Sequence, residues 1–128
     1  MAGQPPTALI VEDDEALRAL YVAAFRLRGF RVDDAEFAHV AIDRLSERPY
    51  DVLVVDLMLP IESGVYVVDK VRSLPHPRPE IIIITGADSS AVKAIDRSLV
   101  RAILFKPINV KALIAYATEV VEEKRAAR

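Results

Sequence analysis

The sequence predicts a doubly wound α/β domain, in which a parallel sheet lies between two layers of helices. Three observations support this fold class: short apolar runs recur along the chain, stretches with helical periodicity separate them, and most runs are closed by a polar or charged residue. Short, continuous runs rich in β-branched residues are typical of strands that are covered on both faces, as the strands of a parallel sheet are.

The apolar runs predict five strands. Four of them share one format and lie at residues 8–11, 52–55, 81–84 and 102–105, closed in turn by Glu12, Asp56, Thr85 and Lys106. The fifth and weakest run, at residues 30–33, alternates apolar and polar side chains, which is typical of a strand at the edge of a sheet.

The stretches between the runs predict five amphipathic helices. Asp14 is available as the N-cap of the first helix and Gly29 as its stop. The apolar faces of the five helices are marked, in chain order, by Leu17, Leu20, Tyr21 and Ala24; by Ala38, Ala41, Ile42 and Leu45; by Val67, Val68 and Val71; by Val92, Ile95 and Leu99; and by Leu113, Ile114, Ala117, Val120 and Val121. Five such units with right-handed crossovers predict a flavodoxin-like (βα)5 three-layer sandwich with parallel strand order 2-1-3-4-5.

The length of 128 residues fits one domain. We expect residues 1–7 to form a flexible N-terminus, residues 8–125 the folded domain, and residues 126–128 a C-terminal tail. A stiff surface loop is predicted at residues 75–79, because three of these five residues are proline.

Composition narrows the function classes. The chain is 52% apolar and 28% charged, and no apolar run approaches the roughly 20 residues that a membrane-spanning helix needs, so we expect a cytoplasmic protein with no membrane contact. Because there is no cysteine, a bound metal would be held by oxygen ligands or by the two histidines, and oxygen is favoured. A formal net charge of −2 argues against direct binding of nucleic acid.

The polar residues that close the strands are predicted to converge. In a parallel sheet the carboxyl ends of the strands meet at one edge, and ligands bind there at the reversal of strand order. Glu12, Asp13 and Asp56 would then form a cluster of three carboxylates, flanked by Thr85 and Lys106. Such a cluster requires a cation. Mg²⁺ suits it best, because it accepts few protein ligands and commonly bridges carboxylates to a phosphoryl group.

Asp56 is the candidate nucleophile of this cluster, because carboxylates form acyl phosphates and this one lies centrally, against the predicted metal. Lys106 would neutralise phosphoryl oxygens, and the hydroxyl of Thr85 would donate a hydrogen bond to one of them. The residues therefore predict Mg²⁺-dependent phosphoryl transfer to Asp56.

Four segments together resemble the receiver domains of bacterial response regulators, the chemotaxis-protein-Y-like phosphorylation switches of two-component phosphorelay systems. The segments are IVEDDE at residues 10–15, DLMLP at 56–60 followed by Gly64, ITGAD at 84–88 and FKP at 105–107. The resemblance extends over residues 7–122, and the order of the four segments at the ends of alternating strands gives it its weight.

The resemblance implies roles in phosphorylation and switching. Asp56 would be the phosphoacceptor, Lys106 the phosphoryl-binding lysine with a cis bond to Pro107, and Thr85 the switch hydroxyl. Many receivers carry Tyr or Phe three residues before the lysine, whereas this chain has Ile103 there. We therefore expect the signal to pass through residues 86–90 and the helix that follows them.

The resemblance also implies the metal ligands and the rate of hydrolysis. Asp13 would bind Mg²⁺ directly and Glu12 partly through water, together with Asp56 and the backbone carbonyl of Met58. Family members often place polar side chains at the positions of Met58 and Ala87 to hold the hydrolytic water. Because neither side chain is polar here, we expect the domain to catalyse its own phosphorylation but only slow dephosphorylation.

The expected partners follow from the same resemblance. A histidine kinase or a histidine phosphotransfer protein would donate the phosphoryl group, and phosphorylation would alter partner binding to an output that the sequence does not specify. The face formed by the fourth helix, the fifth strand and the fifth helix is the expected partner surface and a candidate dimer interface.

Three alternative functions remain open. A haloacid-dehalogenase-type phosphatase also forms a phospho-aspartate, but it needs a second acid two residues after the nucleophile, where Met58 stands. A flavin carrier of the same fold would have glycine and hydroxyl groups in place of the acidic loop at residues 12–15. A pseudo-receiver would bind partners without phosphorylation, although every phosphorylation residue is present.

Overall fold

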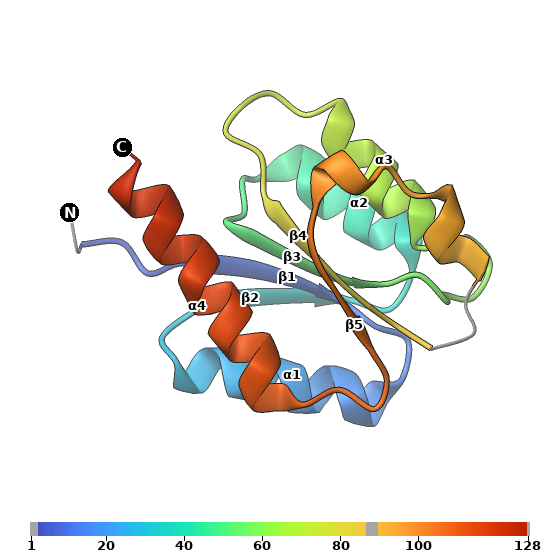
Figure 1. The fold of residues 1–128 in the computed structure, drawn as a ribbon, viewed down its shortest axis with the longest axis horizontal. Helices are drawn as coiled ribbons and strands as arrows, with labels where there is room; N and C mark the ends of the chain where they lie inside the picture. Colours follow the sequence, from blue (N-terminus) through green and yellow to red (C-terminus); the bar gives the residue numbers. More distant parts are fainter. Residues whose placement is uncertain (1–2, 87–89, 128) are drawn as a thin grey trace.

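The computed structural model describes residues 3–86 and 90–127, and it contains one sheet of five parallel strands in the predicted order β2-β1-β3-β4-β5 (Figure 1). The elements in chain order are β1 (Thr7–Val11), α1 (Glu15–Leu27), β2 (Arg31–Ala35), α2 (Ala38–Glu47), β3 (Val52–Asp56), α3 (Val65–Arg72), β4 (Glu80–Thr85), the 3₁₀ turns η1 (Ser90–Ala94) and η2 (Arg97–Leu99), β5 (Val100–Phe105) and α4 (Val110–Ala126). The predicted fold class is confirmed.

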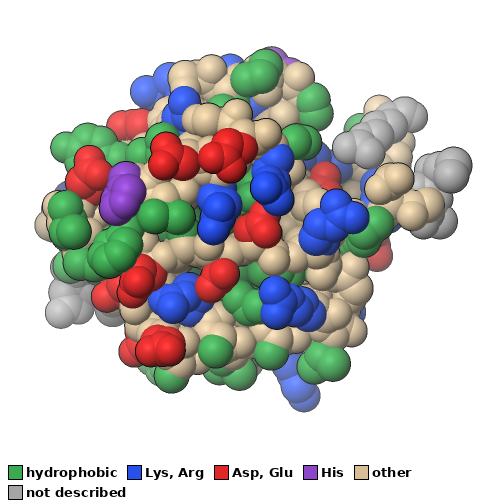
Figure 2. All heavy atoms as spheres, turned by 180° about the vertical axis from the view of Figure 1, so that it is seen from behind, with side chains coloured by type: hydrophobic (Ala, Val, Ile, Leu, Met, Phe, Trp, Pro, Cys, Tyr) green, Lys and Arg blue, Asp and Glu red, His purple; other side chains and the backbone are tan. Residues whose placement is uncertain are grey.

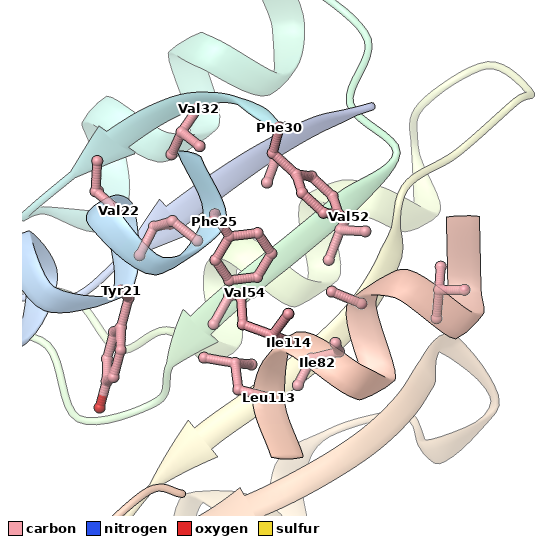
Figure 3. Close-up of a cluster of buried hydrophobic side chains, with 14 of the residues drawn as sticks. Tyr21, Val22, Phe25, Phe30, Val32, Val52, Val54, Ile82, Leu113 and Ile114 are labelled. Atoms are coloured by element: carbon pink, nitrogen blue, oxygen red, sulfur yellow. The ribbon is translucent and has the colours of Figure 1, made fainter. Parts of the chain in front are cut away.

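The sheet separates two apolar cores. Helices α1 and α4 cover one face, where Phe25 and Phe30 pack edge to face with ring centroids 4.9 Å apart (Figure 3). Helices α2 and α3 and the 3₁₀ turns cover the other face. Because the central strands are covered on both sides, the four apolar residues 81–84 of β4 are all fully buried.

The predicted fourth helix is wrong. The marker residues Val92, Ile95 and Leu99 fall in two 3₁₀ turns and the link between them, so the described residues contain four α-helices rather than five. Asp96 gives the physical reason: its side chain accepts hydrogen bonds from the backbone N–H of Ser98 at 3.0 Å and from the Ser98 hydroxyl at 2.6 Å. Such local bonds compete with the helical backbone and start a new turn.

The ends of the domain lie close to the predicted boundaries. Strand β1 begins at Thr7, whose backbone N–H donates to Asp51 at 2.9 Å, and α4 runs to Ala126. Strand β1 thus begins one residue before, and α4 ends one residue after, the predicted folded part at residues 8–125. The division of the chain into domain and termini stays a prediction. Asp14 caps α1 as expected, and Gly29 follows this helix with φ of 85°.

Two bonds before proline are cis among the described residues. The bond between Lys106 and Pro107 is cis, as predicted, and the bond between His76 and Pro77 in the loop before β4 is cis as well.

On the face shown in Figure 2, acidic and basic side chains are interspersed rather than gathered by sign. None of the helices within the described residues is long and apolar enough to cross a membrane.

Candidate phosphoryl-transfer site

The sheet brings the predicted polar residues to one edge. Strands β1 and β3 are neighbours, with Val11 paired to Val55, so the acidic residues after β1 lie beside Asp56 at the end of β3. Thr85 ends β4, and its carbonyl accepts a hydrogen bond of 2.8 Å from the backbone N–H of Lys106. The convergence predicted from the sequence is therefore present in the fold.

Lys106 bridges the two buried carboxylates of the site. Its Nζ lies 2.7 Å from Oε1 of Glu12 and 2.7 Å from Oδ2 of Asp56, while those two residues are only 0% and 2% exposed. Burial lowers the pKa of Lys106, but the hydrogen bonds to Asp56 and Glu12 and the negative charges of these two carboxylates together outweigh burial and leave the pKa above its usual range. The lysine is therefore a fixed positive charge beside Asp56.

The charged form of Glu12 is less favoured than that of an exposed glutamate. Burial raises its pKa from its usual value of 4.5 to about 6, although hydrogen bonds from Lys106 and from the backbone N–H of Asp14, at 3.2 Å, act in the opposite direction. The nearby charge of Asp56 raises it further. A second cation close to Glu12 would offset this cost.

The three acids have the geometry of a cation site. One carboxylate oxygen from each of Glu12, Asp13 and Asp56 lies within 4.8 Å of the others. The donor set consists of oxygen alone, which suits a hard divalent ion such as Mg²⁺. Asp13 is exposed and opens the cluster to solvent, whereas the other two acids are buried.

Met58 contacts Asp56 through its backbone. Its N–H donates to Oδ1 of Asp56 at 2.8 Å, so both oxygens of this carboxylate have a partner. The side chain of Met58 is 58% exposed. The role predicted for the Met58 carbonyl as a metal ligand stays a prediction.

Thr85 carries an orphaned hydroxyl. Its residue is fully buried, yet Oγ1 has no hydrogen-bond partner among residues 3–86 and 90–127. A buried hydroxyl without a partner is costly, and an acceptor that arrives at the site would remove that cost.

The other predicted switch residue, Ile103, is partly buried on β5, where it pairs with Ile83 of β4. Ala87 lies outside the described residues, as does most of the predicted signalling segment at residues 86–90.

Gly64, in the loop after β3, is required by a close backbone contact that the sequence alone does not show. A Cβ atom on Gly64 would lie 2.1 Å from the carbonyl oxygen of Asp56 and 2.8 Å from Cα of Leu57, so only glycine fits. The N–H of Gly64 donates to the Leu57 carbonyl at 2.9 Å. The start of α3 is thus packed directly on the backbone of the candidate phosphoacceptor.

Residues 8–118 match the response regulator receiver domain family. The chain belongs to this family. It is 36% identical over 108 residues to a cyclic di-GMP phosphodiesterase of Thermotoga maritima, covering 84% of this chain and 28% of that protein. It is 33% identical over 107 residues to the sensory transduction protein LytR of Staphylococcus haemolyticus, covering 82% of this chain and 41% of that protein.

Solved receiver structures share the fold. A CheY-like response regulator receiver domain protein from Methanospirillum hungatei superposes with a TM-score of 0.88 at 22% identity, over 98% of this chain and all of that one. The receiver spans well under half the length of the two curated relatives named above, so the activities in their names describe those longer proteins. Membership of the receiver family supports the predicted class, a phosphorylation-dependent switch of two-component systems.

Proposed function

We propose that this receiver accepts a phosphoryl group on Asp56 in a Mg²⁺-dependent reaction, with a phosphohistidine of a histidine kinase or phosphotransfer protein as donor. The observation that carries the proposal is the position of the Asp56 carboxylate. One of its oxygens lies 2.7 Å from the Nζ of Lys106, and an oxygen of Glu12 and an oxygen of Asp13 each lie within 4.8 Å of a carboxylate oxygen of Asp56. A carboxylate beside both a fixed cation and a candidate metal site is suited to phosphoryl transfer.

The metal would be held by Asp13 and Asp56, by the Met58 carbonyl, and partly through water by Glu12. When bound, Mg²⁺ neutralises the charge that repels a phosphate from three carboxylates. The family match and the grouping of the three acids support this assignment.

The transfer itself is a substitution at phosphorus. A carboxylate oxygen of Asp56 bonds to phosphorus as the bond to the donor histidine nitrogen breaks, and the freed imidazole takes up a proton. Lys106 turns from its pairs with Asp56 and Glu12 toward the phosphoryl oxygens. The hydroxyl of Thr85, which has no partner within the described part of the chain, donates to one of these oxygens.

The change at Thr85 is the proposed start of the signal. Thr85 is the last residue of β4, so its movement shifts the segment between β4 and β5. That segment, β5 and α4 form the proposed partner surface and candidate dimer interface, on which Phe105 is 49% and Tyr116 39% exposed. We also propose a cytoplasmic location, which is where histidine kinases act. The proposed division of the chain is a flexible N-terminus at residues 1–7, the receiver domain at 8–125 and a C-terminal tail at 126–128.

Self-dephosphorylation is proposed to be slow. Met58 is exposed at the site but offers only a thioether side chain, which does not orient a water in line with the acyl phosphate. Substitution Met58→Asn supplies an amide and should raise the rate of phosphoryl loss several-fold, measured by following the decay of the phosphorylated protein after removal of the donor. An unchanged rate in Met58→Asn, or rapid loss from the unchanged chain, would contradict this part of the proposal.

The proposal is tested by intact-protein mass spectrometry after incubation with acetyl phosphate. We expect one phosphoryl adduct on the unchanged chain with Mg²⁺, and none with excess EDTA or on Asp56→Asn. If no adduct forms while another receiver reacts under the same conditions, a pseudo-receiver that binds partners without phosphorylation becomes the better account.

A further inference from the structure

Arg18 ties the acidic turn after β1 to the end of β2. Its Nη1 donates to the carbonyl of Glu12 at 2.9 Å and reaches the carbonyl of Asp13 at 3.5 Å. Its Nε pairs with Oδ2 of Asp34 on β2 at 3.0 Å. One guanidinium therefore contacts both backbone carbonyls of the acidic pair, and its own side chain is only 17% exposed.

Asp13 is the acid whose position depends most on this contact. The carboxylates of Glu12 and Asp56 are each held by Lys106, 2.7 Å away. The carboxylate of Asp13 makes no hydrogen bond or ion pair with any other residue that the structure describes, so its place is set by its backbone. Arg18 holds that backbone.

We propose that Arg18, anchored by Asp34, is a positioning residue that sets the affinity of the site for Mg²⁺ by fixing the backbone of Asp13. The inference rests on the proposed function, because it assumes that Asp13 is a metal ligand. Residues that orient metal ligands affect affinity without touching the ion.

The charge of Arg18 gives a way to separate positioning from electrostatics. A cation near a metal site repels the ion, and loss of Arg18 leaves the half-exposed carboxylate of Asp34 uncompensated. If charge alone mattered, Arg18→Met would therefore bind Mg²⁺ more tightly. If Arg18 acts by positioning, the same substitution weakens binding.

The test is isothermal titration calorimetry of the full chain with Mg²⁺. We expect Arg18→Met to weaken binding about tenfold, within the range found for residues that orient metal ligands. Arg72→Met is the matched control. Arg72, the last residue of α3, makes an ion pair of the same length with Asp96, at 3.0 Å, and among the described residues it has no hydrogen bond or ion pair with Glu12, Asp13 or Asp56. The control should bind Mg²⁺ as the unchanged chain does.

A second measurement needs no metal. Amide hydrogen exchange at residues 13 and 14 in EDTA should be faster in Arg18→Met than in the unchanged chain, while exchange in the β3 and β4 strands is the same, which shows that the variant is folded. Equal or tighter Mg²⁺ binding by Arg18→Met, or unchanged exchange at residues 13 and 14, overturns the inference alone. Absence of Mg²⁺ binding by the unchanged chain overturns the proposed function together with it.

Discussion

Lys106 allows Glu12 and Asp56 to be buried beside each other. Its ammonium lies 2.7 Å from an oxygen of each, and without it two carboxylates that are almost fully buried would face each other without a cation. Removing one partner of a buried charge cluster leaves the others uncompensated, which is costly.

Substitution Lys106→Met should therefore destabilise the metal-free protein, by about 1–3 kcal/mol once the partial exposure of the lysine is allowed for. Mg²⁺ should restore more stability in this variant than in the unchanged chain, because the ion replaces the lost positive charge. Urea unfolding in EDTA and in Mg²⁺ measures both effects. Equal stabilisation of the two proteins by Mg²⁺ would show that the ion does not lie between these carboxylates.

Glu12 predicts a dependence of stability on pH. Burial raises its pKa to about 6 in the folded state from 4.5, so the folded protein holds this proton more tightly than the unfolded chain does. The free energy of unfolding of the metal-free protein therefore falls as pH rises from about 4.5 to 6, by about 2 kcal/mol at most from this group.

The measurement is urea unfolding of the unchanged chain and of Glu12→Gln across this pH range in EDTA. Other groups titrate in both proteins, so the difference between the two curves isolates Glu12. The stability of the unchanged chain should decline relative to Glu12→Gln as pH rises. A constant difference across the range would mean that Glu12 titrates normally.

Individual site residues were predictable because each closes an apolar run. Glu12, Asp56, Thr85 and Lys106 all stand at this place, and the parallel sheet brings them together. Arg18 was not predictable in the same way, because a charged residue on an exposed helix turn usually contacts only water and its contact with two carbonyls depends on tertiary structure. The catalytic and metal-binding roles themselves stay predictions.

At the scale of elements, the loop between β3 and α3 is the most constrained part of the site. Gly64 lies so close to the backbone of Asp56 that an added Cβ would meet its carbonyl oxygen at 2.1 Å. The backbone of residues 56 and 57 would have to move to admit any side chain there.

Substitution Gly64→Ala should therefore lower the free energy of unfolding by about 2 kcal/mol or more and slow phosphorylation by acetyl phosphate. Gly86→Ala is the matched control, because its added Cβ has no atom of the described residues within 4 Å and should change stability by less than about 1 kcal/mol. Thermal unfolding of both variants provides the comparison. A Gly64→Ala protein as stable as Gly86→Ala would show that the loop adapts easily.

The elements also show where prediction from sequence fails. The central strands and the helices α1, α2, α3 and α4 were predictable, because burial on one or both faces leaves a clear apolar period. Residues 92–99 carry a helical period too, but Asp96 and Ser98 form local side-chain bonds that end one turn and begin another. The spacing of apolar residues alone does not reveal that side-chain hydrogen bonds compete with the helical backbone.

At the scale of the whole molecule, five polar residues from four separate segments meet at one edge of a sheet. The strand order 2-1-3-4-5 is responsible, because it places β3 between β1 and β4 and so puts Asp56 centrally. Family membership adds the signalling role, and the geometry adds a candidate nucleophile, a cation and a buried hydroxyl that has no partner among the described residues. We propose that phosphorylation of Asp56 is the function of this edge of the sheet.

Peptide mass spectrometry can locate the residue that is phosphorylated. After reaction with acetyl phosphate and Mg²⁺, borohydride reduces an aspartyl phosphate to homoserine, which peptide mass spectrometry assigns to a position. We expect homoserine at position 56 and at no other aspartate position. Homoserine at Asp13 or Asp51, or at no position while another receiver is modified in parallel, would contradict it.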